Sequence, residues 1–190
     1  FAEKKADPKQ VIYIAFDPEV VIECRKQLPE FQAHWLSSLT AMDEEGKADG
    51  YWNELLRTKA TGFQFSWKAP VEAQWLKKLK DNGYKLTSWT VNDVDVARRM
   101  IRLGVDCITT DRPGGLRQEL NDTSNVWNVR DHIARKDFVI QSHRGAGELG
   151  PENSKEAFEL AWSLGTVPEA DIRTTSDGVI VAFHDKDFNR

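Results

Sequence analysis

Short apolar runs alternate with helix-period segments along almost the whole chain, and this alternation constrains the fold most. Apolar residues recur at helical spacing in residues 71–79, 94–101 and 156–164. The runs expected to form strands are residues 11–16, 31–36, 63–67, 85–89, 105–109, 138–142, 167–172 and 179–183. Strands that alternate with helices form a parallel sheet. The sequence therefore predicts an α/β fold, namely a TIM-type (β/α)8 barrel, with a doubly wound sheet as the alternative.

Length and charge limit the class of protein. A chain of 190 residues can bury the core of one ordinary domain. Its net charge of −4 disfavours nucleic acid or an acidic membrane as the main partner. No apolar run approaches the roughly 20 residues of a membrane span. The first residues are polar, so we expect a soluble protein, cytoplasmic or exported with its leader removed. Cys24 and Cys107 have apolar neighbours and are expected to be buried free thiols.

Residues suited to binding anions begin with His143, Arg144 and Gly145. They follow the expected strand 138–142, and the C-terminal ends of barrel strands form the catalytic face. Arginine offers phosphate oxygens a planar fork of donors. Alone, His143 could equally satisfy a loop carbonyl. The arginine and glycine beside it favour a phosphate site.

Glu169 and Asp171 alternate on one expected strand, so their side chains should point to the same face. Two neighbouring carboxylates repel each other unless a cation is shared between them. Hard oxygen ligands suit Mg²⁺ or Ca²⁺. The alternative is a solvated strand edge. The pair therefore predicts a metal site.

His184 and Asp185 follow the expected strand 179–183, which should deliver them to the same rim. One histidine can accept a proton near neutral pH while another donates one. Asp185 could orient the His184 ring or lie near the metal. Asp177, in an expected turn, is interpreted as structural. Two histidines, two carboxylates and an arginine supply the groups needed to cleave a phosphate ester with a divalent metal.

These motifs resemble the glycerophosphodiester phosphodiesterase family. The stretch 139–190 carries HRG at 143–145, PEN at 151–153, E-x-D at 169–171, T-x-D-G at 175–178 and HD at 184–185. Ser154 stands where threonine is usual in the family. The earlier part of the chain resembles the end of the same family, with Ala-Phe-Asp at 15–17, Trp89 and Thr-Asp-Arg-Pro at 110–113.

The resemblance implies a TIM-type barrel, a divalent metal, Ca²⁺ or Mg²⁺, and hydrolysis of glycerophosphodiesters to glycerol 3-phosphate and an alcohol. It also implies that Asn153 caps the following helix. The implied site residues are His143 and His184 as acid and base, Arg144 as a phosphate clamp, Trp89 beside the substrate, Glu169 and Asp171 as metal ligands, and Glu152 as a supporting group.

The two halves of the family pattern occur in reversed order. Residues 1–120 resemble the family's C-terminal half and residues 137–190 its N-terminal part, with 112–136 as a connector. The first and last strands of a closed barrel are neighbours, so a circular permutant is physically reasonable. A fragment across two tandem domains, or two segments numbered as if continuous, would give the same pattern. We interpret residues 1–190 as one barrel domain, permuted or incomplete.

One strand of the family pattern has no clear counterpart. The family's E-x-K strand supplies a third metal ligand and a lysine for the substrate phosphate. Residues 3–5 have the right letters but lie too close to residue 11, because a crossover needs a dozen or more residues. A barrel of this kind takes about 250 residues, so one strand should be missing. We therefore expect an open seam, which exchange in a homodimer could close.

Three functions stay open. The leading one is a metal-dependent phosphodiesterase. The second is a non-catalytic phosphate-binding relic or fragment, which the missing strand supports. The third is a phospholipase D-like enzyme acting on lysophospholipid or sphingolipid, which the seven tryptophans keep open. Of the remaining histidines, His34 is expected inside the barrel or behind the site, and His132 on the surface.

Overall fold

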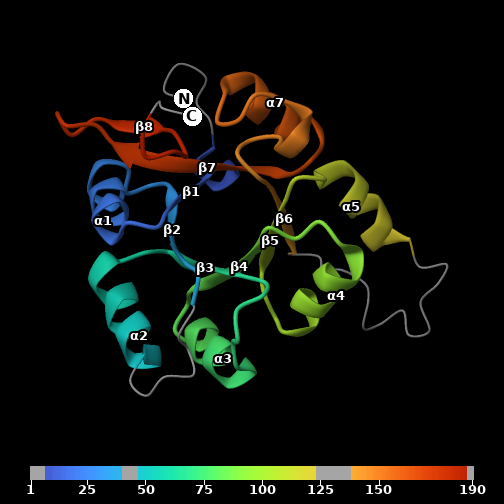
Figure 1. Ribbon diagram of the computed structural model, residues 1–190, viewed down its shortest axis with the longest axis horizontal. Coiled ribbons are helices and arrows are strands. Elements are labelled where there is room, and N and C mark those ends of the chain that lie inside the picture. The colour runs from blue at the N-terminus through green and yellow to red at the C-terminus, as the bar shows by residue number, and fades with distance from the viewer. Residues whose placement is uncertain (1–6, 40–46, 123–137, 188–190) are drawn as a thin grey trace.

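Parallel strands form a closed barrel in the computed structural model, which describes residues 7–39, 47–122 and 138–187. Neighbours pair in chain order, and the last barrel strand pairs back to the first. The barrel strands in these ranges are β1 (Ile12–Ala15), β2 (Gln32–Ser37), β3 (Gly62–Ser66), β4 (Lys85–Trp89), β5 (Cys107–Thr110), β6 (Val139–Ser142) and β7 (Val167–Thr174). The helices lie outside this ring (Figure 1). The TIM-type prediction is confirmed, with seven strands in the described barrel.

The expected open seam is wrong for the described barrel. Ile12 of β1 pairs in register with Glu169 of β7, and Ile14 pairs with Asp171. The two strands that would flank an additional strand therefore meet directly. Closure of the described barrel needs no exchange with a second chain. The E-x-K-like letters at residues 3–5, His132 and most of the expected connector lie outside the described residues.

The run expected as the eighth barrel strand forms a hairpin instead. β8 (Ile180–Ala182) pairs antiparallel with the end of β7, with Ile172 opposite Ala182. The turn is closed by the Val179 N–H, which donates to Thr175 Oγ1 at 3.0 Å, and by Gly178 at φ +84°. The hydroxyl of Thr175 also donates to Asp177, which confirms the structural role predicted for that residue. So short a connection cannot cross over to a parallel strand.

The helices that cover the barrel include three whose first turn is capped by a side chain. Asp17 caps α1, Asp93 caps α4 and Ser154 caps α7, each accepting backbone N–H bonds from the first turn. The prediction that Asn153 caps α7 is wrong by one residue, because the Ser154 hydroxyl accepts the Ala157 N–H at 3.1 Å. The helices are α1 (Pro18–Gln27), α2 (Lys47–Thr58), α3 (Ala73–Asp81), α4 (Val94–Arg102), α5 (Pro113–Asn121) and α7 (Lys155–Ser163).

An apolar layer between the barrel and the helices forms the main core. Phe63 and Phe65 of β3 are fully buried there, and Trp75 of α3 packs edge-on against Phe63 with ring centroids 5.5 Å apart. Cys24 and Cys107 are buried free thiols, as predicted. No helix within the described ranges is both long and apolar enough to cross a bilayer.

The inside of the barrel holds a network of buried polar side chains beside a small apolar cluster of Ile12, Ile14 and Leu36. The amide of Gln64 lies 3.2 Å from His34 Nδ1 and donates across the barrel to Gln141 Oε1 at 3.4 Å. The hydroxyl of Thr109 donates to the same oxygen at 3.2 Å. Burial lowers the pKa of His34 to about 3, so this histidine is neutral in the fold. His34 therefore lies inside the barrel, as expected.

Gly62 leaves the space that His34 occupies. A Cβ at this position would lie 2.5 Å from His34 Nε2 and 2.6 Å from the Lys85 carbonyl oxygen. We expect Gly62→Ala to lower the free energy of unfolding by about 1–3 kcal/mol, because the closely packed neighbours of the added methyl group cannot shift without strain. Urea denaturation measures this change.

The matched control is Gly50 on α2, where an added Cβ would meet nothing within 4 Å. Gly50→Ala should raise the free energy of unfolding by up to about 1 kcal/mol, because alanine is the better helix former. Similar effects at positions 50 and 62 would contradict the tight packing around His34.

Candidate active site

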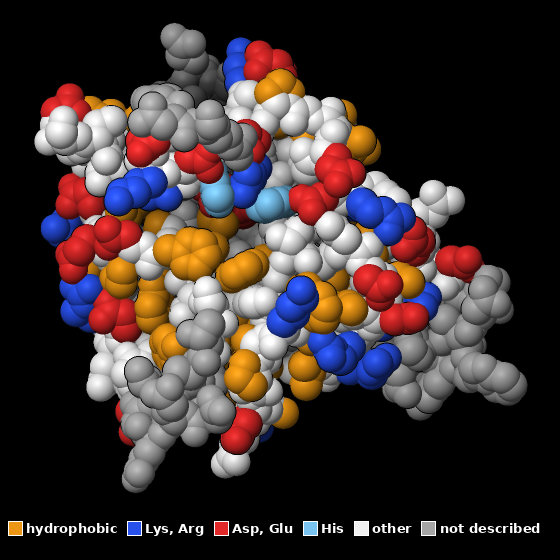
Figure 2. All heavy atoms as spheres, viewed as in Figure 1, with side chains coloured by type: hydrophobic (Ala, Val, Ile, Leu, Met, Phe, Trp, Pro, Cys, Tyr) orange, Lys and Arg blue, Asp and Glu red, His pale blue; other side chains and the backbone are white. Residues whose placement is uncertain are grey.

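Ionisable side chains meet at the C-terminal ends of three neighbouring barrel strands. Asp111 follows β5, His143 follows β6, and Glu169 and Asp171 belong to β7. His184 follows β8 and joins them from the hairpin. Figure 2 shows two histidine side chains close together on this face, with acidic and basic side chains around them and apolar ones beside them. His143 and His184 are both partly exposed, unlike the buried His34.

His143 is held by an aspartate from the neighbouring strand. Its Nδ1 lies 2.6 Å from Asp111 Oδ1. The Asn92 amide donates to Asp111 Oδ2 at 2.7 Å, and Asn92 Oδ1 accepts the Asp111 N–H at 2.9 Å. Burial alone would raise the pKa of Asp111, but the hydrogen bonds from Asn92 and His143 outweigh burial and bring it below its usual value. An ionised Asp111 can only accept, so His143 Nδ1 carries the proton and Nε2 is the acceptor in the neutral ring.

Sequence reasoning recognised the Thr-Asp-Arg-Pro segment but gave Asp111 no role in the site. The one signal was that Asp111 follows a strand which, in a closed barrel, neighbours the strand before His143. The segments containing Asp111 and His143 were matched to opposite ends of the family pattern. Their proximity therefore depends on the pairing of β5 with β6, which local sequence patterns do not report.

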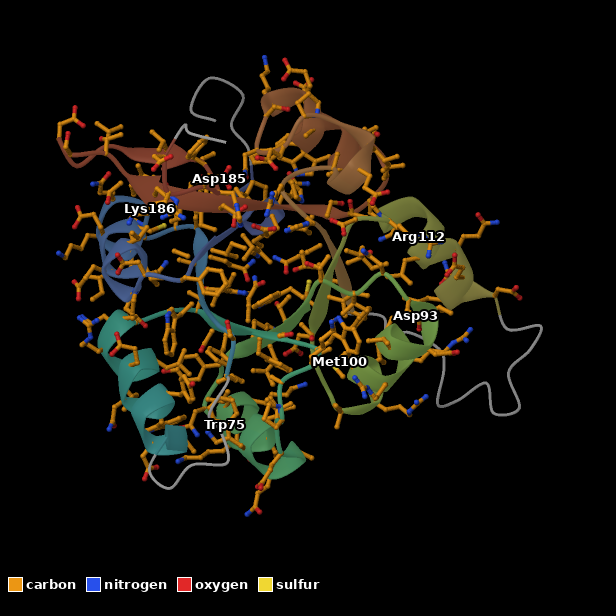
Figure 3. All side chains as sticks on the ribbon, viewed as in Figure 1. Trp75, Asp93, Met100, Arg112, Asp185 and Lys186 are labelled. Atoms are coloured by element: carbon orange, nitrogen blue, oxygen red, sulfur yellow. The ribbon has the colours of Figure 1, made fainter. Side chains whose placement is uncertain are left out.

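His184 is fixed from both sides of its backbone and through its ring. The ring Nδ1 lies 2.7 Å from Asp185 Oδ1. The Phe183 N–H donates to the Asp171 carbonyl oxygen at 3.0 Å, and the guanidinium of Arg173 donates to the His184 carbonyl oxygen. Asp185 lies near β7 in Figure 3, which draws the side chains as sticks. The structure thus brings His184 and Asp185 to the rim, although by a hairpin and not by a barrel strand.

Glu169 and Asp171 form a buried carboxylate pair. Glu169 is 0% exposed and Asp171 is 9% exposed. The Arg144 N–H donates to Glu169 Oε2 at 3.1 Å, while Glu169 Oε1 has no hydrogen-bond partner among the described residues. Burial, and next the charge of Asp171, hold the pKa of Glu169 well above its usual value. A buried carboxylate oxygen that lacks a donor fits a bound cation.

The carboxylate oxygens at the site can be compared with the ligands that a divalent metal ion requires. Within the described ranges, no three His, Cys, Asp or Glu residues form a cluster that could hold a metal ion. Mg²⁺ is commonly held by one or two carboxylates, with waters and substrate phosphate completing its shell. Glu169 and Asp171 therefore fit a divalent cation that binds together with a phosphate ligand.

Arg144 lies between the carboxylate pair and the outer rim. Its Nη1 donates to Glu152 Oε2 at 2.7 Å, and its Nε lies 3.6 Å from Asp171 Oδ2. The Asn153 amide approaches the same Asp171 oxygen at 3.4 Å, and its Oδ1 accepts the Asp171 N–H at 3.1 Å. Glu152 thus supports Arg144 directly, and a phosphate at this place would compete with carboxylates for the guanidinium.

An aromatic pair borders the site on the opposite side of the β1–β7 junction. Trp89, at the end of β4, packs edge-on against Phe16 with ring centroids 5.8 Å apart. Phe16 is 51% exposed. A cavity of about 220 Å³ lies over the junction of β1 and β7, lined among others by Phe16, Asp171 and His184. We call this cavity the junction pocket. It is large enough for a small alcohol next to the ionisable groups.

The arrangement can transfer protons and bind an anion. One histidine presents an acceptor nitrogen, a second histidine faces the same region, and buried carboxylates can hold a cation. Acid–base cleavage of a phosphate ester needs these groups within reach of one substrate.

Of three solved structures compared with this chain, two have a TM-score of 0.50 and share the fold. One is a phosphodiesterase from Oleispira antarctica in complex with the product sn-glycerol-3-phosphate, with a TM-score of 0.50 and 17% identity over 58% of this chain and 42% of that chain. A Silicibacter pomeroyi protein named for glycerophosphoryl diester phosphodiesterase has a TM-score of 0.49 and 27% identity, over 62% and 40% of the two chains. A FabK mutant from Thermotoga maritima has a TM-score of 0.50 and 14% identity, over 86% and 61%.

The match to the first two structures therefore spans about two fifths of their length. No curated protein sequence matches the chain. The model of the glycerophosphoryl diester phosphodiesterase family matches residues 1–115 and 143–190. These two segments include Asp111 and His143, which are hydrogen-bonded to each other, as well as the carboxylate pair and His184. Because the match covers most of the sequence, the chain belongs to the glycerophosphoryl diester phosphodiesterase family.

Proposed function

We propose that the chain hydrolyses glycerophosphodiesters to glycerol 3-phosphate and an alcohol, with a divalent metal and two histidines. The observation that carries this proposal is the hydrogen bond between His143 Nδ1 and the ionised Asp111. This pair lies beside the buried carboxylates Glu169 and Asp171. Family membership and the Oleispira antarctica complex with sn-glycerol-3-phosphate support the substrate class.

In the proposed mechanism, His143 is the general base. Its Nε2 accepts the proton of the nucleophile, which is either water or a neighbouring hydroxyl of the substrate; in the second case a cyclic phosphate forms, and water then opens it to glycerol 3-phosphate. Asp111 keeps the ring in the required tautomer and stabilises the imidazolium that forms. The Asn92 amide holds Asp111 in place for this task.

His184 is the general acid, because it lines the junction pocket, which can hold the alcohol. It gives its proton to the departing alkoxide, and Asp185 orients its ring. Trp89 and Phe16 form the aromatic wall beside the substrate.

Glu169 and Asp171 are the proposed metal ligands, and Ca²⁺ or Mg²⁺ is the proposed cation. Its contribution when bound is to polarise a phosphoryl oxygen and to stabilise developing negative charge. The support for this assignment is Glu169 Oε1, a buried oxygen without a donor among the described residues. Arg144 turns from Glu152 to a phosphate oxygen when the substrate binds.

The decisive experiment measures glycerol 3-phosphate released from glycerophosphocholine by the purified chain, with Ca²⁺, with Mg²⁺ and with EDTA. We expect turnover that depends on the cation and falls to background in Glu169→Gln. His143→Ala serves as the inactive control. A folded chain that releases no product under any of these conditions would refute the proposal and favour a non-catalytic phosphate-binding relic.

A second candidate is favoured by the exposed Phe16 beside Trp89. Apolar surface at the mouth of the site suits a phospholipase D-like enzyme that acts on lysophospholipid or sphingolipid. Comparison of kcat/KM for glycerophosphocholine and for micellar lysophospholipid separates the two candidates. Preference for the micellar substrate would support the lipid-directed enzyme.

A further inference from the structure

The hairpin that carries His184 extends beyond the parallel pairing of the barrel. β7 leaves the barrel pairing after Asp171, and its last residues pair antiparallel with β8. His184 lies beyond the end of β8, where it has no partner in the β7–β8 ladder. Its place at the rim must therefore be set by side chains and single backbone bonds.

Arg173 supplies one such link. It lies on β7 two residues after Asp171, and its guanidinium reaches over the hairpin to the His184 carbonyl oxygen. Its Nε donates at 2.9 Å and its Nη2 at 2.6 Å to this one oxygen. The second link is the Phe183 N–H bond to the Asp171 carbonyl oxygen at 3.0 Å. Both links connect the residues around His184 to the strand that bears the carboxylate pair.

We infer that Arg173 is the positioning residue of His184, and that it sets the distance between this histidine and the carboxylate pair on β7. The inference rests on the proposed function, in which His184 is the general acid. Arg173 touches the backbone of His184 and lines the junction pocket from the side of β7.

The planar guanidinium suits this task better than an ammonium. Two N–H groups in a rigid fork fix both the distance and the direction of the carbonyl they bind. Lysine could donate to the same oxygen from many directions, so the histidine would move more freely. A proton donor displaced by about 1 Å can reduce the rate by about 100-fold without changing substrate binding.

Arg173→Lys is therefore the informative variant. We expect kcat for glycerophosphocholine to fall by about 10- to 100-fold while KM changes by less than about twofold, because the loss concerns the transition state. In Arg173→Ala, added guanidinium should restore part of the lost kcat.

Arg117 offers a matched control. Its guanidinium also spans carbonyl oxygens, donating to Leu164 at 3.3 Å and to Gly165 at 2.5 Å, but these lie between α5 and the loop before β7. Arg117→Lys should leave kcat within about twofold of the unchanged chain, because no proposed site group is touched. An equal fall of kcat in Arg173→Lys and Arg117→Lys would overturn the inference, because the effect of Arg173 would then be a general structural one.

A second readout does not depend on turnover. In protein labelled at histidine, the ring signals of His184, assigned with His184→Gln, should shift or broaden in Arg173→Lys and stay unchanged in Arg117→Lys. The His143 signals should stay unchanged in both. Unmoved His184 signals in Arg173→Lys would overturn the inference. If the unchanged chain shows no turnover, the proposed function fails, and these spectra still decide whether Arg173 positions His184.

Discussion

The substitution Asp111→Asn should lower kcat for glycerophosphodiester hydrolysis by about 10²- to 10⁴-fold, close to the loss expected for His143→Ala. The carboxylate of Asp111 can only accept, and this keeps the proton on His143 Nδ1. An amide can turn its NH₂ group towards Nδ1, which moves the ring proton to Nε2 and removes the base. KM should change little, because the substrate does not contact Asp111 in the proposed mechanism.

The measurement is steady-state kinetics of glycerol 3-phosphate release, with Asp106→Asn as the matched control. Asp106 precedes the opposite end of β5, where it accepts the Leu86 N–H at 3.0 Å and lies 3.3 Å from Lys80 Nζ. Asp106→Asn should leave kcat within about threefold, since it lies away from His143. Full activity in Asp111→Asn would show that the bond between Asp111 and His143 does not control the tautomer.

His34 should make the chain less stable in acid. Burial is the largest cause that lowers its pKa from 6.5 to about 3, and the smaller effects of Asp106 and Lys85 oppose each other. Between these values the unfolded chain binds a proton that the folded chain does not. This contribution is therefore complete above pH 6.5 and is lost progressively as the pH falls towards 3. From pH 7 to pH 5 the loss should reach about 2 kcal/mol, at about 1.4 kcal/mol per pH unit.

Urea denaturation at pH 7 and pH 5 tests this expectation in the unchanged chain and in His34→Gln. The variant should be less stable at pH 7, because it disturbs the bonds among His34, Gln64 and Gln141. Its further loss between pH 7 and pH 5 should be smaller by about 2 kcal/mol. His184→Gln, which replaces a partly exposed histidine, should keep the acid sensitivity of the unchanged chain. Equal acid sensitivity in all three would mean that His34 binds its proton equally well in the folded and in the unfolded chain.

The apolar runs predicted the barrel strands well, because the burial of a strand is visible in the residues of that strand alone. The run 85–89 has the bounds of β4, and the run 138–142 contains β6. The run 179–183 has the same character but forms a hairpin strand, because pairing direction depends on the short turn before it. The direct pairing of β7 with β1 was also missed, since closure depends on the whole ring and not on any single segment.

For the site, the sequence indicated the ionisable residues but not their partners. His143, Glu169, Asp171 and His184 reach one rim, which the positions of the motifs at strand ends predicted. Asp111 and Arg173 were missed as partners, because their contacts are set by the pairing of β5 with β6 and by the geometry of the hairpin. The roles of all these residues stay predictions until the variants are measured.

The two segments that match the family meet at two places in the barrel. One meeting place is the hydrogen bond between Asp111 and His143, just beyond the ends of β5 and β6, and the other is the β7–β1 pairing, where Asp171 lies beside Ile14. Each junction thus carries part of the site. Separation of the strands at either junction would displace ionisable groups of the site directly. Separation elsewhere in the barrel would affect these groups only indirectly. If the chain has the proposed activity, loss of this activity would report a barrel that is only partly closed, because the ionisable groups would then lie on separated strands.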